Sequence, residues 1–132
     1  SVSRDCNIKD VFNFLNNNQE IINLIGENRI FPLFTTDITK PSLVYNWKQG
    51  KKNLTLYEST LSLNIIWSDF DLIMEIENLL TSLLDFISKT QFCELDGYLF
   101  NSIRQGGGLY VYNSKLKTYE KTINFTITWK EV

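Results

Sequence analysis

One amphipathic segment, residues 69–88, limits the possible folds of this chain more than any other feature. Its apolar side chains recur at spacings of three and four, which places them on one wide face of a helix. Ser68 or Asp69 is expected to cap its start, because a side-chain oxygen there accepts a hydrogen bond from an unpaired backbone N–H. Such a face must pack against another layer of the protein. The face consists of Leu72, Ile73, Ile76, Leu79, Leu80, Leu83, Phe86 and Ile87.

Two long segments alternate apolar and polar side chains and supply that second layer. Residues 57–67 precede the helix, and residues 118–130 end in the alternating run Ile123, Phe125, Ile127 and Trp129. A period of two is typical of an antiparallel strand with one buried face. Both segments therefore predict strands of a half-covered sheet.

The N-terminal third predicts two short helices and a short extended piece. Asp5 is expected to cap a helix with its apolar face over residues 8–15, and Asn16–Asn18 interrupts it, because Asn favours turns. A further helical turn, Gln19–Ile25, ends at Gly26. Residues 29–32 read as an extended piece that a proline stops.

The remaining segments predict three more strands and two loops. Pro41 opens a strand that continues to Trp47, and residues 48–53 are expected to form a loop. Residues 98–104 and 109–112 predict two strands, and the glycine-rich residues 105–108 are expected to join them as a hairpin turn.

This order, α–β–β–α–β–β–β, predicts an α+β fold. We expect a mostly antiparallel sheet with two main helices packed on one face, in a single domain spanning residues 1–132. The chain of 132 residues is 43% apolar and 14% aromatic, which is enough for a core and unlike a disordered chain.

The overall charge and the cysteines argue against several functional classes. A net charge of -2 gives no global field that would attract nucleic acid or membrane. No apolar run approaches the length of a membrane span, and the first ten residues lack the apolar core of a signal peptide. Cys6 and Cys93 match no metal-binding spacing, and we expect two reduced thiols.

The absence of histidine argues against catalysis. It removes the usual general base at neutral pH, the commonest zinc ligand and the Ser-His and Cys-His nucleophile pairs. Asp71 and Glu75 share a helix face but have no second motif beside them, and carboxylates near a helix start also complement its dipole. We therefore expect no enzyme, no cofactor and no metal site.

The candidate functional residues are instead charged and glycine-rich surface segments. Lys40, Lys48, Lys51 and Lys52 occur without an acid in residues 38–57, whereas acidic residues dominate residues 69–96. Apart from a plain soluble surface, this asymmetry suggests head-to-tail association, with the basic segment of one copy on the acidic helix of the next. The candidate interface residues are Lys48, Lys51, Lys52, Asp71, Glu75, Gly106, Gly107 and Gly108.

The order of these motifs resembles the tail-terminator or tail-completion proteins of long-tailed bacteriophages. The most telling stretch is Ile25-Gly26 followed by Arg29-Ile30-Phe31-Pro32. A proline-led strand at Pro41, a long amphipathic strand, the helix and the closing strands complete a similarity that spans nearly the whole chain.

The resemblance implies a structural role in the virion tail, after assembly in the host cytoplasm. Proteins of this kind form a ring, usually a hexamer, on the tail tube, where they end tube polymerisation and present a surface to the head connector. Phage DNA passes through the lumen without sequence-specific binding. The expected partners are further copies of the chain, the tail tube protein and head–tail connector proteins.

Two alternatives remain open from the sequence. One is a different virion adaptor, such as a head–tail connector or a baseplate subunit. The other is a small-molecule-binding or enzymatic α+β domain, which needs an apolar pocket with a few polar groups. The aromatic side chains available to line such a pocket are Trp47, Trp67, Tyr110, Tyr112 and Trp129.

Overall fold

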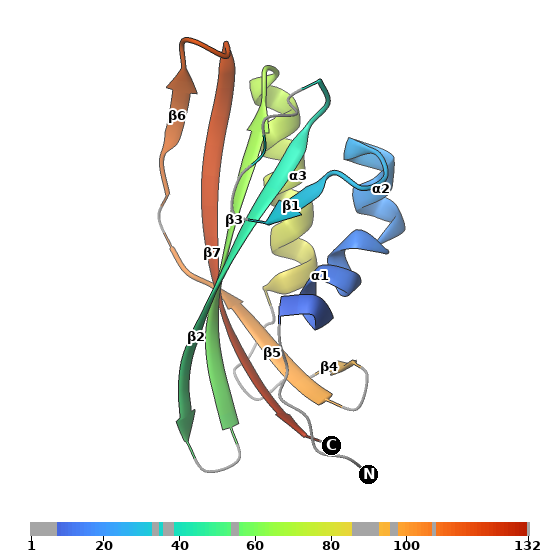
Figure 1. Ribbon diagram of the computed structural model, residues 1–132, viewed down its shortest axis with the longest axis vertical. Coiled ribbons are helices and arrows are strands. Elements are labelled where there is room, and N and C mark those ends of the chain that lie inside the picture. Colours follow the sequence, from blue (N-terminus) through green and yellow to red (C-terminus); the bar gives the residue numbers. More distant parts are fainter. Residues whose placement is uncertain are drawn as a thin grey trace.

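A computed structural model of the chain describes residues 8–32, 35, 39–53, 56–85, 93–95, 98–106 and 108–131. Helices lie on one side of a strongly twisted sheet (Figure 1). The predicted α+β class is confirmed. The elements are α1 (Ile8–Asn16), α2 (Gln19–Ile25), β1 (Ile30–Pro32), β2 (Ser42–Asn53), β3 (Leu56–Trp67), α3 (Phe70–Leu84), β4 (Cys93–Leu95), β5 (Tyr98–Arg104), β6 (Tyr110–Asn113) and β7 (Thr118–Glu131).

Within the described residues, seven strands form one sheet in the order β1-β2-β3-β7-β5-β4, with β6 also paired to β7. Only β1 and β2 run parallel, and every other pair is antiparallel. β3 and β7 pair along most of their length, from Tyr57 opposite Trp129 to Trp67 opposite Tyr119. These two strands carry most of the alternating pattern in the sequence, so they form the centre of the sheet.

The core lies between the sheet and α3. Leu61, Leu63 and Ile65 of β3 face the same side as their register partners on β7, and all of them are buried. Ile73, Ile76, Leu80 and Leu84 of α3 are buried against this layer, as the helical stripe predicts. The predicted main helix is therefore the element that covers the sheet.

The short N-terminal helices extend the same layer. The ring of Phe12 lies 5.6 Å from that of Tyr45, and the ring of Phe14 lies 5.8 Å from that of Phe100. Asn18 caps α2, since its side chain accepts a hydrogen bond from the N–H of Ile21. The Asn-rich interruption therefore both ends α1 and starts α2.

The residues of the most telling motif fix the junction between α2 and β2. Gly26 follows α2 with φ 92, a backbone angle that favours glycine. Arg29 is 6% exposed, and its guanidinium donates to the carbonyls of Lys40 and Pro41 and to the hydroxyl of Ser42. This motif therefore anchors the fold, and it places β1 parallel to β2.

The prediction of a loop at residues 48–53 is wrong. β2 continues to Asn53 and stays paired with β3, with a register shift between Gln49 and Lys52. Gly50 lies at this irregularity, and a Cβ built on it would be 2.6 Å from the backbone oxygen of Glu58. The glycine here permits a bulge rather than a turn.

The prediction of a hairpin turn at residues 105–108 is also wrong. β5 and β6 do not pair with each other: both lie along the same β7, with Arg104 opposite Phe125 and Tyr110 opposite Lys121. β5 and β6 therefore run in the same direction along one edge of β7, and the segment between them interrupts that edge. The true hairpin follows β6, where the Asn113 side chain accepts hydrogen bonds from the N–H groups of Lys115 and Leu116.

Other boundaries differ at the ends of elements. Asp69 is the N-cap of α3, as expected, but the helix ends at Leu84 because Asp85 is extended. Residues 86–88, which include Phe86 and Ile87, lie outside the described residues. The short strand β4 was not predicted, and of the two cysteines Cys6 lies outside the described residues.

Candidate functional site

The predicted interface residues lie at two ends of the sheet. Lys48 is exposed on β2, opposite Thr60. The backbones of Lys51 and Lys52 belong to the same strand, while their side chains lie outside the described part of the structure. Asp71 and Glu75 are exposed on the first turns of α3, which begins where β3 ends. Since Lys48 is paired near the start of β3, the chain does not bring these lysines and acids together.

Two glycines of the predicted segment lie at the surface beside β7. Gly106 and Gly108 are exposed between β5 and β6, and Gly107 lies outside the described residues. Gly108 has φ 113, and a Cβ there would be 2.8 Å from the backbone oxygen of Thr122. This conformation lets the chain step from β5 to β6 while it stays close to β7.

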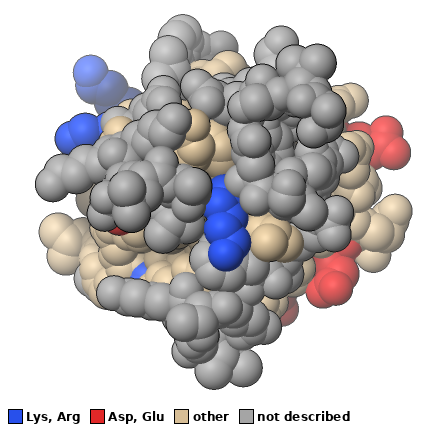
Figure 2. All heavy atoms as spheres, turned by 90° about the horizontal axis from the view of Figure 1, so that it is seen from below, with Lys and Arg blue, Asp and Glu red and all other residues tan. Residues whose placement is uncertain are grey.

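The described charges at the opposite end of the molecule are mixed in sign. Figure 2 shows this end, with basic side chains on the left and at the centre and acidic side chains mainly on the right.

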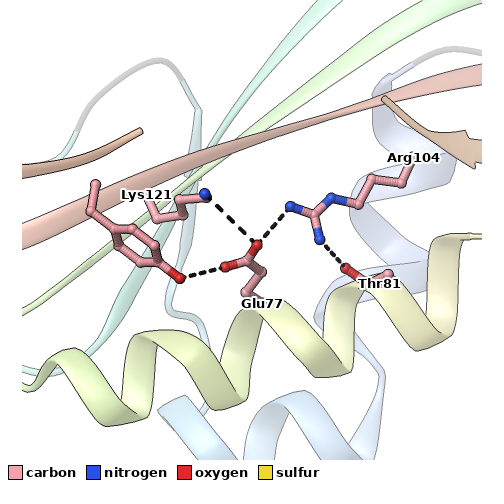
Figure 3. A network of polar contacts seen from close by, with 5 residues as sticks. Glu77, Thr81, Arg104 and Lys121 are labelled. Carbon is pink, nitrogen blue, oxygen red and sulfur yellow. Dashed lines mark hydrogen bonds and ion pairs between the residues drawn. The ribbon is translucent and has the colours of Figure 1, made fainter. Parts of the chain in front are cut away.

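A buried polar cluster joins α3 to the sheet, and its centre is Glu77. This carboxylate is 8% exposed. One oxygen accepts a hydrogen bond of 2.6 Å from Arg104 and lies 4.0 Å from the ammonium of Lys121. The other oxygen accepts a hydrogen bond of 2.8 Å from the Tyr110 hydroxyl. Figure 3 shows Glu77 rising from α3 between Arg104 and Lys121.

The electrostatics of the cluster hold Glu77 ionised. Burial raises the pKa of Glu77, but the hydrogen bonds from Tyr110 and Arg104 and the charges of Lys121 and Arg104 outweigh burial, so the pKa is lowered. Burial and the hydrogen bond to Glu77 raise the pKa of Tyr110. A carboxylate that is held ionised by fixed donors is a poor general acid or base at neutral pH. The cluster therefore fits a structural role.

This cluster fastens β6 and the start of α3 to each other. The Phe70 ring lies 4.6 Å from Tyr110 and 5.6 Å from Tyr119, and the Tyr112 ring lies 5.0 Å from Tyr119. The Lys121 ammonium lies 4.3 Å from the centre of the Tyr110 ring. Tyr110, Phe70 and Glu77 are thus held in place around one short strand.

The apolar side chains of this strand and of the residues next to it are exposed. We call this surface the β6 patch. Large exposed apolar patches on soluble proteins mark interaction sites more often than isolated exposed residues do. The sequence reasoning missed the patch, because it assigned β6 to a hairpin with β5. The patch consists of Leu109, Tyr110, Val111, Tyr112 and Leu116 in and next to β6, together with Phe70 of α3, whose ring packs on Tyr110; all of them are exposed.

The three tryptophans proposed for a ligand pocket do not converge, whereas Tyr110 and Tyr112 lie at the same end of the sheet as Trp67. Trp129 is 1% exposed and stacks on Tyr57, with ring centres 4.1 Å apart, at one end of the β3–β7 pair. Trp67 lies at the other end of that pair, and Trp47 lies opposite Leu61 between them. These aromatics form successive rows of the core layer rather than the wall of one pocket.

Two further properties concern the described part of the chain. No helix there has the length and apolar character needed to cross a membrane. No group of three or more cysteine, aspartate and glutamate side chains there is arranged to hold a metal ion.

A scan against models of protein families gives no match for this chain, and neither does a search of curated proteins.

Proposed function

We propose that the protein is a structural component of a phage tail that forms a ring on the tail tube and ends its polymerisation. The observation that carries this proposal is the β6 patch, an apolar surface on a strand at the sheet edge. Native proteins usually cover or charge such edges, because an open edge pairs with other chains. The exposed apolar side chains lie on a strand that Glu77 and Phe70 of α3 hold in place. Such an edge suits assembly better than catalysis.

The arrangement of the sequence motifs supports the same proposal. The resemblance to tail-terminator proteins rests on the order of elements from Gly26 and Arg29 through the long strand, the helix and the closing strands. If the chain acts as a tail terminator, its ring meets the tube on one side and the head connector on the other. Other virion adaptors share the requirement for oligomers but meet different partners.

Tube polymerisation in vitro tests the proposal. The protein is added in increasing amounts to polymerising tube protein of the same phage, and tube length is measured by negative-stain electron microscopy. We expect shorter tubes with a ring at one end, because a bound ring blocks further addition. An unrelated protein of similar mass is the control. Unchanged tube lengths and bare tube ends at molar excess would contradict the terminator role, and binding to a connector alone would favour an adaptor.

A further inference from the structure

β6 is a short strand at the edge of the sheet (Figure 1). Among the described residues it pairs with β7 alone. The preceding strand on the same edge is closed at its end, because the backbone N–H of Arg104 donates to the carboxylate of Asp85. No described side chain closes the backbone of residues 110–113 in this way. An extended chain can therefore add to β6 through backbone hydrogen bonds.

The other open edge of the sheet has features that discourage such addition. From Asn46 to Asn53, β2 has no strand partner on the side away from β3 within the described residues. This stretch contains three lysines and a register shift beside Gly50. Lysines and bulges are common protections of edge strands. Residues 110–113 contain no charge and no proline, and their pairing with β7 has no register shift. β6 is therefore the less protected edge.

Two cross-strand rows end in a tyrosine of β6, on the face of the sheet that α3 covers. Trp67 of β3, Tyr119 of β7 and Tyr112 of β6 are register partners on three successive strands. Tyr110 ends the neighbouring row, opposite Lys121. Tyr110 is 40% exposed and Tyr112 is 53% exposed. A strand added beside β6 would place its own side chains next to these two rings, where aromatic and large aliphatic groups form favourable cross-strand pairs.

The cluster around Glu77 holds this edge in a fixed position. The Tyr110 hydroxyl donates to Glu77 over 2.8 Å, the Lys121 ammonium lies 4.3 Å from the centre of the Tyr110 ring, and the Phe70 ring lies 4.6 Å from the same ring. A partner that adds to β6 therefore does not have to order this strand, which lowers the entropic cost of binding.

The turn after β6 raises a lipid surface as a competing partner. Leu116 is exposed between the exposed Lys115 and Lys117. Apolar groups beside lysines are also typical of proteins that bind anionic membranes. The open backbone favours a peptide instead, because the N–H and C=O groups along β6 would have no partner in the apolar part of a bilayer. An added strand supplies a partner for these groups.

We propose that the β6 edge binds an extended segment of a different protein, which adds to the sheet as a further strand. The segment carries aromatic or large aliphatic side chains at alternate positions, which lie beside Tyr110 and Tyr112. This inference deepens the proposed function, because it gives the kind of partner that the β6 patch takes. It rests on the proposed function only for the identity of the virion protein that carries the segment.

The first experiment measures peptide binding to the whole chain. The probes are capped, fluorescein-labelled peptides of about eight residues, in which threonine alternates with tyrosine, phenylalanine or leucine. Fluorescence anisotropy measures their dissociation constants. We expect saturable binding, and binding weaker by about tenfold or more for the same residues in an order without alternation. The absence of saturable binding by every alternating peptide would overturn the proposal.

Backbone methylation separates strand addition from adhesion of apolar side chains. Two versions of the tightest peptide carry N-methyl groups on alternate residues, and each version blocks the hydrogen bonds of one edge of the added strand. We expect one version to lose binding and the other to keep it, because only one edge of the added strand faces β6. Equal binding of both versions would contradict strand addition.

The second experiment changes β6 itself. Tyr112→Lys removes the ring at the end of the aromatic row and places a charge beside the apolar side chains of the peptide. Val111→Lys changes the other face of the same strand and removes no ring contact. Both should raise the dissociation constant about tenfold or more, since lysine in an edge strand discourages pairing. Asn46→Lys, an exposed position on the opposite edge, should leave it unchanged. Circular dichroism confirms that the variants fold.

The possible results separate this inference from the proposed function. Peptides that do not bind to a protein that still shortens tubes would overturn the inference alone. Peptide binding that Tyr112→Lys abolishes, in a protein without effect on tubes, would support the inference and contradict the tail-terminator role.

Two other occupants of the edge have their own signatures. Binding to vesicles of phosphatidylcholine and phosphatidylglycerol that Tyr112→Lys abolishes, without peptide binding, would identify a lipid surface and overturn the proposal. Dimers in sedimentation velocity that Tyr112→Lys abolishes, again without peptide binding, would identify a second copy on the edge and also overturn it.

Discussion

At the scale of single residues, Glu77 is the position at which sequence reasoning and structure differ most. Asp71 and Glu75 drew attention because they share a helix face, but both are exposed. Glu77 is the buried carboxylate of α3, and its partners Arg104 and Tyr110 lie far along the chain. Helical periodicity places Glu77 beside the core face, yet only the β7 register brings these partners to it. Local patterns do not contain that information.

The lowered pKa of Glu77 predicts an acid-sensitive contribution to stability. A carboxylate with a depressed pKa in the folded state stabilises the protein above its unfolded pKa of about 4.3, and this contribution is lost as the pH falls through the folded value. Glu77→Gln should therefore lower the free energy of unfolding by about 1–3 kcal/mol at pH 7, since it leaves buried donors without their charged acceptor. Urea denaturation from pH 3 to pH 7 measures the difference.

The pH dependence distinguishes this account from simple loss of packing. The difference between wild type and Glu77→Gln should shrink as the pH falls below the unfolded pKa of about 4.3 and through the lower pKa of the folded carboxylate. Glu75→Gln is the matched control: its carboxylate is exposed on the same helix, and we expect a change within about 0.5 kcal/mol at every pH. A difference at Glu77 that stayed constant from pH 7 to pH 3 would mean that its charge does not stabilise the fold.

At the scale of elements, the glycines show why the predictions of a loop and of a hairpin turn are wrong. Glycine in a stretch of polar residues predicts a turn, and residues 48–53 and 105–108 both fit that description. In the structure, Gly50 lies in a bulge of β2, and Gly108 lies in a step between two strands on one edge. Bulges and turns need the same residue type, so composition alone does not separate them. The long alternating strands and the capped helices, in contrast, were predictable from local patterns.

Substitution of two exposed glycines, Gly50 and Gly106, should give different results. Gly50→Ala should destabilise the protein by about 1–3 kcal/mol, because the added Cβ would meet the Glu58 backbone oxygen at 2.6 Å. Gly106→Ala meets nothing within 4 Å and should be neutral, or stabilising by up to about 1 kcal/mol. Thermal unfolding of both variants checks this. A Gly50→Ala protein as stable as Gly106→Ala would mean that β2 does not approach β3 so closely at the bulge.

At the scale of the whole molecule, the sequence predicts the layers well and the edges poorly. The face of α3 from Ile73 to Leu84 and the alternating face of β7 determine that a helix covers an antiparallel sheet. The order of strands within the sheet depends on pairings between distant segments, and these placed β6 beside β7 rather than β5. The candidate interface depends on those edges, which is why the β6 patch emerged only from the structure.

The core prediction is testable by charge insertion. Ile76 is 2% exposed on α3, and Ile76→Asp would bury an unpaired charge against the sheet. We expect the variant to be unfolded or to lose at least about 3 kcal/mol of stability, measured by circular dichroism and urea denaturation. Asn78→Asp, at an exposed position of the same helix, should fold normally. An Ile76→Asp protein with native stability would mean that α3 does not cover the sheet through this face.

The proposed function requires that copies of this chain assemble into a ring on a tail tube. Multi-angle light scattering over a range of concentrations, alone and with the tube protein of the same phage, tests it most directly. We expect a discrete species, near six times the 15.4 kDa chain mass for a hexamer, either free or bound to tubes. A monomer under every condition, with no binding to tubes, would contradict it.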